Sequence, residues 1–440
     1  MSPADPDGNE VGKLLCIGHF PYDVVHLVSV ARRVRERLGF EAVFVSVAPT
    51  EVAADVRQRV STEGFEALDR SLMAKDDPSV RNPFRRYRRQ RLATLGLMDE
   101  LLAEVRPTAV ISTVNPPPGL FLDEAARRGV PTVLLQLFHW GDRSSFRDRL
   151  VDERRQHDAR KSVQGRLKRR VERRIQAFYG VGPHVEWDLR EAKIAVQGPG
   201  LRRRLVAERV PSENVVVTGN PALDDLHRLR HSLNAARDRL RARLGLPENA
   251  RVITQTRTYE DRLLTLDRNS RTDSQVRIIQ ALGEAAPEAQ VVVKIHPREG
   301  DAVEAFVRSI DPGVLVVGEE LPTNELIAAS DVVVSTASTT LLHAVVLDRP
   351  TVSVWLWPGL DYLRRSTAWS AVDRVDSPGA LTESVRRHLH NPQYQAEWQA
   401  RRDAFIKEEY LLDGQGTSRV VDLVERLTRE PTNPLAVSQP

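Results

Sequence analysis

The sequence has only one cysteine and no long apolar run. Cys16 is the single thiol among 440 residues, so no disulfide can form within the chain, and its place in an apolar stretch predicts a buried, unreactive side chain. No segment approaches about 18 consecutive apolar residues, so no transmembrane helix is predicted. The polar, acidic amino terminus lacks the apolar core of a secretory signal. We therefore expect a cytoplasmic protein.

Several motifs of nucleotide and metal enzymes are also missing. No Gly-x-Gly-x-x-Gly follows the first predicted strand, and no Gly-x-x-x-x-Gly-Lys-Ser/Thr occurs anywhere. These absences argue against dinucleotide oxidoreductases and phosphate-loop NTPases. No Asp-x-Asp at the end of a predicted strand, and no close His/Cys spacing, suggests a metal site. Neither a metal nor another cofactor is therefore predicted.

Positive charge is unevenly distributed, although the formal net charge is only +4. Basic clusters occur at residues 81–91, 168–174 and 202–204. Such clusters can hold an anionic membrane, a phosphorylated substrate or nucleic acid, and a solvated arginine-rich helix face explains them equally well. No aromatic stacking platform or nucleic-acid motif accompanies them, so nucleic acid is not an expected partner. Peripheral contact at the inner face of the plasma membrane stays open.

Hydrophobic patterning predicts two α/β halves. In the first half, strands are predicted at residues 13–18, 41–47, 108–113, 131–138, 177–181, 193–196 and 214–218. In the second half they are predicted at 251–255, 290–294, 313–317, 331–335 and 350–355. Helical segments between the strands indicate right-handed crossovers and parallel sheets. The predicted fold class is therefore α/β, with two Rossmann-like, doubly wound domains facing a cleft.

The domain boundaries follow from breaks in this pattern. We predict an amino-terminal, acceptor-side domain over residues 1–225 and a linker over residues 226–248. A nucleotide-binding domain is predicted over residues 249–429. The proline-rich tail, residues 430–440, is predicted to be disordered.

A strand of the second half leads directly into Lys294-Ile295-His296-Pro297. Open α/β sheets bind ligands at the carboxyl ends of their strands. Lys294 and His296 are two residues apart, so they share one face of an extended chain, and Pro297 fixes the turn. A cation beside an imidazole suits a diphosphate or a sugar phosphate. An incidental surface turn is the alternative interpretation.

A run of hydroxyl side chains follows the neighbouring predicted strand. It includes Ser335, Thr336, Ser338 and Thr339, and a helix begins directly after it. Hydroxyls and free amides at a helix start form an anion site, although the same residues also serve as helix caps. Thr256 and Arg257 end the first strand of this half, where Arg257 could clamp a phosphate or simply lie at the surface.

Candidate catalytic bases lie in the first half. His19 and Asp23 follow the first strand, and His139 follows the strand that ends near residue 138. A histidine of near-neutral pKa, or a carboxylate, is what a metal-free transferase needs to deprotonate an acceptor hydroxyl. A histidine bonded to a loop carbonyl is the alternative for either histidine taken singly.

With these residues in place, the chain resembles bacterial GT-B-type transferases of surface-polysaccharide assembly. That group includes capsule glycosyltransferases and CDP-glycerol glycerophosphotransferases with a His-Pro motif. The resemblance rests on KIHPRE at residues 294–299, ASDVVVSTASTTLLHAVVLDRP at 329–350 and YLLDGQGTSRVVDLV at 410–424. The segment from residue 193 to residue 226 is also similar to UDP-GlcNAc 2-epimerases. The resemblance covers residues 193–424 well and the preceding part only in outline.

The resemblance implies roles for individual residues. His296 would contact the donor phosphate or ribose, Ser335, Ser338 and Thr339 the phosphates, and Lys294 would add positive charge. Many relatives have a ribose-binding glutamate where this sequence has His343, which puts ordinary ribose recognition in question.

The function that we predict is metal-independent transfer from a nucleotide-activated donor (CMP-, CDP- or UDP-linked) to a surface-glycan or lipid-linked acceptor. One alternative is a UDP-sugar 2-epimerase or hydrolase. The 2-epimerases carry a Gly-Gly and a Glu-Glu near the Ser/Thr run, followed by an Arg-x-x-Thr-Glu-Arg-Pro-Glu segment, and none of these is present at that place in this sequence. The other alternative is a non-catalytic nucleotide- or glycan-binding relative.

Overall fold

The computed structural model forms two compact units. It describes residues 11–18, 21–46, 50–68, 79–113, 118–136, 163–179, 189–257, 268–296, 299–336, 338–356 and 370–429. Unit 1 joins the amino-terminal part of the chain, up to Ala222, with the segment that begins at Tyr410, whereas Leu223–Glu409 form the body of unit 2. Within the described residues, no helix is both long enough and apolar enough to cross a membrane.

Unit 1 is built on a seven-stranded parallel sheet of order β3-β2-β1-β4-β5-β6-β7. Its strands are β1 (Lys13–Gly18), β2 (Glu41–Ser46), β3 (Glu66–Leu68), β4 (Ala109–Ser112), β5 (Thr132–Leu135), β6 (Lys193–Val196) and β7 (Val215–Val217). Its helices are α1 (Pro21–Leu38), α2 (Thr50–Thr62), α3 (Pro83–Val105), α4 (Pro118–Arg127), α6 (Val163–Phe178), α7 (Pro199–Ala207) and α16 (Gly416–Arg429). Alternate strand residues such as Leu14 and Cys16 pack under α1, α2 and α16, because successive side chains of a strand point to opposite faces.

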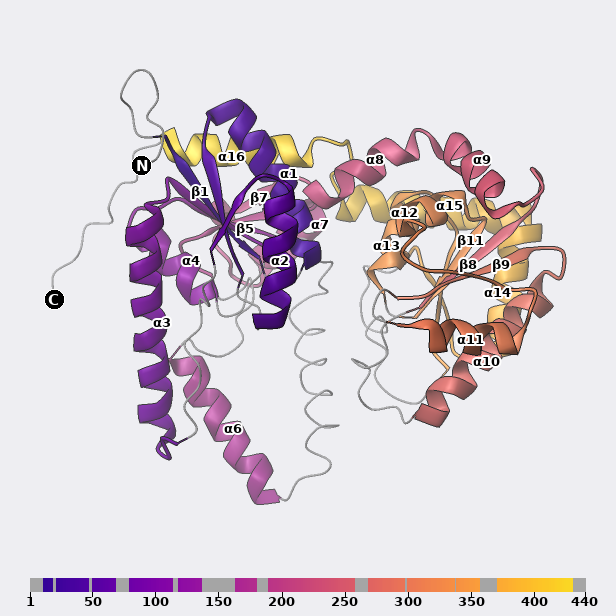
Figure 1. The fold of residues 1–440 in the computed structure, drawn as a ribbon, viewed down its shortest axis with the longest axis horizontal. Helices are drawn as coiled ribbons and strands as arrows, with labels where there is room; N and C mark the ends of the chain where they lie inside the picture. Colours follow the sequence, from indigo (N-terminus) through magenta and orange to yellow (C-terminus); the bar gives the residue numbers. More distant parts are fainter. Residues whose placement is uncertain are drawn as a thin grey trace. The chain divides into compact units, whose positions relative to one another are not determined.

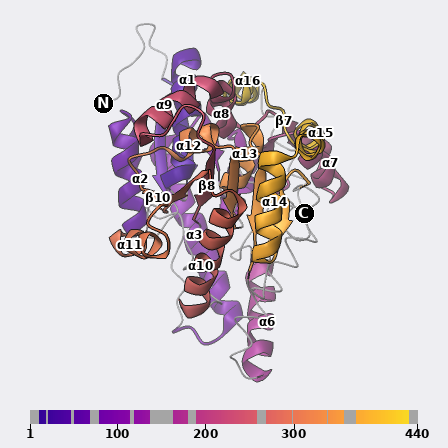
Figure 2. The same ribbon diagram turned by 90° about the vertical axis from the view of Figure 1, so that its right-hand side faces the viewer.

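Unit 2 has a six-stranded parallel sheet of order β10-β9-β8-β11-β12-β13. Its strands are β8 (Val252–Thr256), β9 (Gln290–Lys294), β10 (Leu315–Val317), β11 (Val332–Ser335), β12 (Thr351–Val354) and β13 (Asp373–Val375). Its helices are α8 (Asp224–Arg230), α9 (Leu233–Leu244), α10 (Arg268–Ala285), α11 (Asp301–Ile310), α12 (Thr323–Ala329), α13 (Thr339–Val346), α14 (Pro378–His390) and α15 (Pro392–Glu409). Helices α10, α11 and α14 cover one face, and α9 and α12 cover the other (Figure 2).

In both sheets the chain adds strands first on one side of a central pair and then on the other. In unit 2 the chain proceeds outward from β8 through β9 to β10, and then from β11 through β12 to β13. The chain therefore reverses its direction of growth between β8 and β11. Such a switch point leaves a crevice at the carboxyl ends of the two strands, where open α/β sheets bind ligands. The corresponding reversal in unit 1 lies between β1 and β4.

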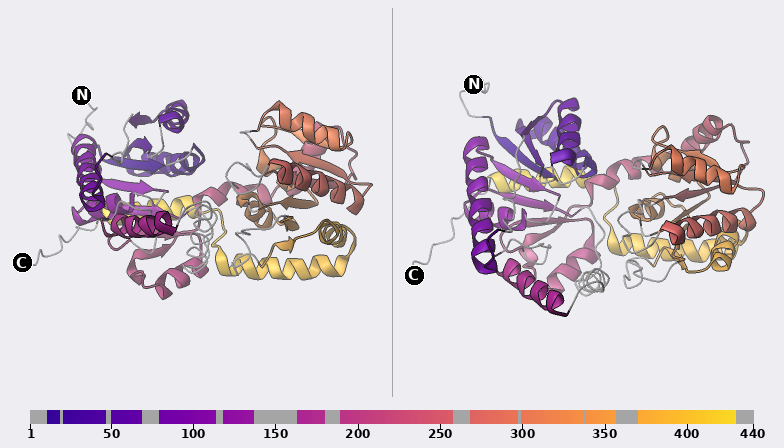
Figure 3. Two further views of the ribbon diagram at one scale, coloured as in Figure 1. Left: turned by 90° about the horizontal axis from the view of Figure 1, so that it is seen from below. Right: turned by 60° about the horizontal axis from the view of Figure 1, so that its bottom comes forward.

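The last helix returns to the first unit. Helix α16 packs on α1, as Figures 1 and 3 show in yellow and indigo, and its Val420 and Val424 are fully buried in the unit 1 core. Arg37 of α1 forms ion pairs with Asp422 and Glu425 of α16. The segment that precedes α16 lies so close to Gly219 that a β-carbon there would come within 2.9 Å of the Leu411 carbonyl oxygen.

These features correct the predicted domain limits in two places. We placed residues up to 429 in the nucleotide-binding domain, but α16 joins unit 1 because its apolar face is buried by α1. We also predicted a linker over residues 226–248. In the structure α9 packs on α12, and Leu240 is buried with Val252 and Leu326 in the core of unit 2.

Two predictions of secondary structure also need correction. The strand predicted at residues 177–181 begins inside α6, which continues to Phe178 and buries Ile175 against Tyr87. Strands β3 and β13 were not predicted, because each is only three residues long and contains charged residues. Helix α2 was not predicted either. The predicted tail, residues 430–440, lies outside the described residues.

Candidate functional site

The candidate site is the carboxyl edge of β9, β8 and β11, three adjacent strands of unit 2. Six residues predicted as donor-binding end these strands or follow them directly: Thr256, Arg257, Lys294, His296, Ser335 and Thr336. We refer to them, with Ser338, Thr339 and His343 of the adjoining helix, as the carboxyl-edge site. The topology thus brings together residues that lie as far apart in sequence as 256 and 343.

Hydroxyl groups connect the two strands at the switch point. The Thr256 Oγ1 lies 2.8 Å from the Thr340 Oγ1, and the Ser335 hydroxyl donates to the Thr256 carbonyl oxygen at 2.7 Å. Ser335 is almost fully buried. The Ser335 hydroxyl therefore links the carboxyl end of β11 to the backbone of β8.

Helix α13 begins at Thr339, four residues after the end of β11. Ser338 is its N-cap, and the Ser338 Oγ accepts a hydrogen bond from the Thr340 N–H at 3.3 Å. Thr339, the first helical residue, is exposed, whereas Thr336 is buried. The amide groups of a first helical turn and the helix dipole favour an anion at this end. The capping role and the anion-binding role considered for the hydroxyl run are compatible in this geometry.

Arg257 is engaged by a residue that the sequence analysis did not single out. Its Nε and Nη2 donate to the Glu299 carboxylate at 3.0 and 2.9 Å, and both side chains are more than nine-tenths buried. Glu299 also accepts from the His296 N–H at 2.9 Å, while its own N–H donates to the His296 carbonyl oxygen at 2.8 Å. The predicted phosphate clamp is therefore occupied by a carboxylate that closes the turn after His296.

Lys294 has backbone partners. Its ammonium group donates to the carbonyl oxygens of Gly318 and, at 2.8 Å, Leu321, in the segment after β10. Burial lowers the pKa of Lys294, and the nearby carboxylates of Glu319 and Glu320 oppose that change. This contact fastens the end of β9 to the segment beyond β10. His296, two residues later, is half-buried at the edge.

His343 lies one helical turn into α13 and faces α12. Its Nδ1 donates to the Asn324 Oδ1 at 3.0 Å, and burial lowers the pKa of His343 to about 4. The ring is therefore neutral near pH 7, with its lone pair on Nε2. A neutral imidazole cannot supply the charge of a ribose-binding carboxylate.

The predicted catalytic bases are not located by the structure. His19, His139 and Pro297 lie outside the described residues. Asp23 falls in the first turn of α1, and its side chain is outside the described part as well. Their assignment stays a prediction.

One further polar cluster of unit 2 escaped the sequence analysis. Asp373 on β13 accepts hydrogen bonds from His388 at 2.7 Å, Tyr394 at 2.5 Å and Arg401 at 2.9 Å. Burial opposes its charged form, but these donors outweigh that effect and hold the pKa of Asp373 well below its usual range. The donors come from α14 and α15, so this cluster fastens both helices to the edge strand.

Comparison with known proteins identifies the family. The UDP-N-acetylglucosamine 2-epimerase family matches residues 195–425, a little over half of the chain. The chain therefore belongs to this family. A comparison with curated protein sequences gives no match.

Solved structures identify the fold as GT-B. The UDP-GlcNAc 2-epimerase of Neisseria meningitidis, bound to UDP-GlcNAc, has a TM-score of 0.59 at 14% identity, over 94% of this chain and 100% of that one. The S. aureus MnaA–UDP complex has a TM-score of 0.56 at 12% sequence identity, and the match covers 94% of this chain and 96% of that one. The calicheamicin glycosyltransferase CalG4 has a TM-score of 0.54 at 17% sequence identity, and the match covers 95% of this chain and 98% of that one. The chain thus shares its fold with both epimerases and glycosyltransferases.

Proposed function

We propose that the protein is a metal-independent transferase that moves a sugar, or a polyol phosphate, from a nucleotide-activated donor to a glycan or lipid-linked acceptor. The observation that carries the proposal is the carboxyl-edge site. There, His296 follows β9 and the start of α13 follows β11; the two strands are not direct neighbours but flank β8, and the switch point lies between β8 and β11. An imidazole and a helix start are suited to a nucleotide diphosphate.

The donor diphosphate would be held by His296, Ser338, Thr339 and the amide groups of the first turn of α13. Arg257 and Lys294 would act indirectly, because Glu299 and backbone carbonyls already engage their charges. The Arg257–Glu299 pair would hold the His296 turn in place, and Lys294 would fix the end of β9. Donors that are fixed before the reaction stabilise the developing charge on a leaving phosphate.

The reaction would be a displacement. The bond between the transferred group and the leaving phosphate oxygen breaks, and the acceptor hydroxyl oxygen forms the new bond. The hydroxyl proton passes to a base, for which His19, Asp23 and His139 are the candidates. The leaving nucleotide carries away the bonding electron pair, and its charge is balanced at the carboxyl-edge site.

A 2-epimerase is the second candidate, and the family match favours it. Relatives bound to UDP or UDP-GlcNAc also support a UDP-linked ligand. Against epimerisation, the charged side chains described at this edge are already engaged. Glu299 is paired with Arg257, and His343 is neutral and bonded to Asn324. Proton removal and return at a sugar carbon needs acid–base groups that are available to the sugar.

Nucleotide binding is tested first. Thermal unfolding is followed with CMP, CDP, UDP and GDP for the wild type, for His296→Ala and for His390→Ala. His390 is an exposed histidine of the same unit beside Arg251, at the opposite edge of the sheet, and serves as the matched control. We expect at least one nucleotide to stabilise the wild type and the control but not His296→Ala. Stabilisation that survives His296→Ala would overturn the proposed site.

The type of reaction is tested next, with the sugar conjugate of the stabilising nucleotide. Proton NMR without acceptor shows whether the donor is converted on its own. A transferase leaves the donor intact until an acceptor glycan is added, whereas an epimerase produces the C2 epimer without one. Epimer formation without acceptor would replace the first candidate by the second.

A further inference from the structure

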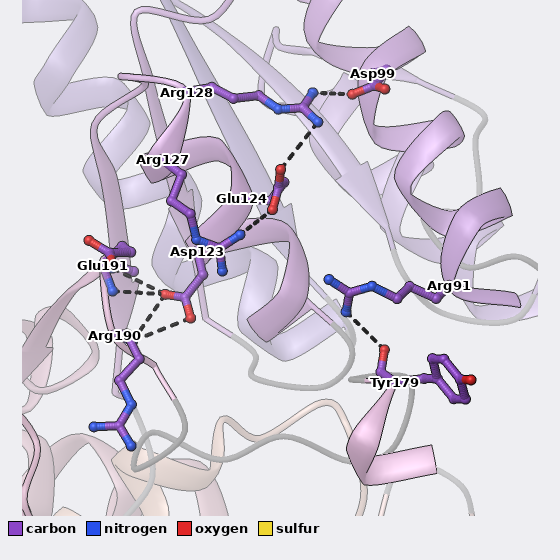
Figure 4. A network of polar contacts seen from close by, with 10 residues as sticks. Arg91, Asp99, Asp123, Glu124, Arg127, Arg128, Tyr179, Arg190 and Glu191 are labelled. Atoms are coloured by element: carbon purple, nitrogen blue, oxygen red, sulfur yellow. Dashed lines mark hydrogen bonds and ion pairs between the residues drawn. The ribbon is translucent and has the colours of Figure 1, made fainter. Parts of the chain in front are cut away.

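Helices α3 and α6 form one exposed surface of unit 1. They contact each other where Tyr87 of α3 packs with Ile175 and Tyr179, and the Arg91 Nη1 donates to the Tyr179 carbonyl oxygen at 2.9 Å (Figure 4). Figure 1 shows the pair along the margin of the unit, with α6 extending past the sheet. Because the two helices contact each other, their exposed side chains can act as one surface, which we call the α3–α6 face.

Large apolar side chains are exposed on this face. Among the described residues, all the strongly exposed large hydrophobic side chains belong to these two helices: Phe84, Leu92, Leu167, Val171 and Phe178. Phe178 is 78% exposed and Leu167 is 63% exposed. Leu167, Val171 and Phe178 are spaced by four and seven residues, which places them on one side of a helix. Ile175, four residues after Val171 and three before Phe178, lies on the same side of α6 and is buried against Tyr87 of α3, so the exposed apolar side chains continue the stripe through which α6 contacts α3.

Arginines surround these apolar side chains. Arg85 and Arg88 are exposed between Phe84 and Leu92, and Arg170 and Arg174 are exposed along α6. Acidic residues are scarce: residues 83–98 contain none, and α6 contains only Glu172. A basic helix with Phe and Leu on its exposed side is typical of segments that lie in the interface of an anionic membrane.

We propose that the α3–α6 face binds the surface of a bilayer that contains anionic phospholipid. The arginines would contact the headgroup phosphates, while Leu167, Val171 and Phe178 enter the boundary between headgroups and acyl chains. This inference goes beyond the proposed function, because it rests on helices of unit 1 and not on the carboxyl-edge site.

Two other partners fit the face less well. In a symmetric pair of chains joined through it, the arginines of both copies would meet with almost no acidic side chains between them, and like charges repel. Nucleic acid would satisfy the arginines, but bases stack on aromatic rings and gain nothing from exposed Leu167 and Val171. A bilayer satisfies both the charge and the aliphatic side chains.

The test is flotation of the full chain with vesicles. One set contains 30 mol% phosphatidylglycerol in phosphatidylcholine and the other contains phosphatidylcholine alone. We expect binding to the anionic vesicles only, and weaker binding at high salt. The charge-reversal variant Arg85→Glu/Arg88→Glu and the apolar variant Leu167→Gln/Phe178→Gln should each lower the affinity about tenfold or more. Because these side chains are exposed, both variants should keep the wild-type unfolding temperature.

The matched control is Arg239→Glu/Arg386→Glu, which reverses two exposed charges on unit 2 and should bind vesicles like the wild type. Three outcomes would overturn the proposal. They are absence of binding to anionic vesicles, equal loss of binding in the control, and loss confined to Arg85→Glu/Arg88→Glu, which would indicate charge attraction without insertion. Sedimentation of the same variants with DNA, and alone at rising concentration, detects the two other partners. The assay needs no donor, so its failure is distinct from failure of the proposed function.

Discussion

The Glu299 carboxylate accepts hydrogen bonds from the Nε and Nη2 of Arg257 and a third one from the backbone N–H of His296. One buried carboxylate therefore connects the end of β8 with the turn after β9. This turn carries His296, the residue on which the proposed donor site depends. The geometry of that site is thus set by a pair of charges that need not touch the ligand.

The first prediction concerns this pair. Glu299→Gln leaves the buried guanidinium without its counter-charge, and breaking such a pair costs about 3–5 kcal/mol. We expect a loss of that size in the free energy of unfolding by urea, together with weaker nucleotide binding. In the double variant Arg257→Gln/Glu299→Gln the loss should be smaller than the sum of the two single losses. Additive losses would mean that the two side chains act independently.

The second prediction concerns pH. The pKa of His343 falls from 6.5 to about 4 on folding, so the unfolded chain binds more protons between these values. The contribution of the neutral His343 ring to the free energy of unfolding is therefore fully present above pH 6.5 and is lost as the pH falls toward 4. We expect this histidine to account for up to about 3 kcal/mol of the loss over that range.

The control is His343→Gln, which keeps a polar side chain that does not titrate. The free energy of unfolding, measured at intervals from pH 7 to pH 4, should decline less steeply in this variant than in the wild type. Equal slopes would show that other groups cause the acid sensitivity.

The third prediction concerns Asp373. Because the donors from His388, Tyr394 and Arg401 stabilise its charge, Asp373→Asn should lower the free energy of unfolding by about 3 kcal/mol. Its depressed pKa means that the difference from the wild type persists as the pH falls from 7 to 4 and shrinks only in stronger acid. Asp376→Asn, at an exposed position of the same segment, should change stability by less than about 0.5 kcal/mol. A similar loss in both variants would contradict the role given to the cluster.

The fourth prediction concerns α16. Val420→Ser places a hydroxyl in the fully buried core of unit 1 and should cost about 2–4 kcal/mol. Asp422→Ser, two residues away, removes only the partly exposed ion pair with Arg37 and should cost less than about 1 kcal/mol. Urea unfolding of the two variants gives the comparison. Val420→Ser as stable as the wild type would show that α16 is dispensable to the unit 1 core.

Much of the fold could be predicted because its signals are local. Strands such as β9 and β11 are short apolar runs that end in polar residues, and the helices between them have regular apolar spacing. The two α/β halves with parallel sheets followed from this alternation, whereas the GT-B assignment came from the resemblance to a known family. The short strands β3 and β13 gave no such signal.

The partners of individual side chains could not be predicted in the same way. Lys294 was expected to face a phosphate, but its bonds to Gly318 and Leu321 depend on β10 lying beside β9, which the sequence does not specify. Glu299 was visible in the KIHPRE motif, five residues after Lys294. Its pairing with Arg257 could be inferred only once β8 and β9 were known to be neighbours. The assignment of α16 to unit 1 likewise depended on which surface buries its apolar face.

The return of α16 has a consequence for how the protein folds during synthesis. The core of unit 1 includes Val420, Val421, Leu423 and Val424, so the ribosome must translate nearly the whole chain before this core can close. Domains that are continuous in sequence can fold in order as they emerge, the amino-terminal one first. In this protein the body of unit 2, from Leu223 to Glu409, is complete while the first unit still lacks its last helix. Unit 2 is therefore expected to finish folding first.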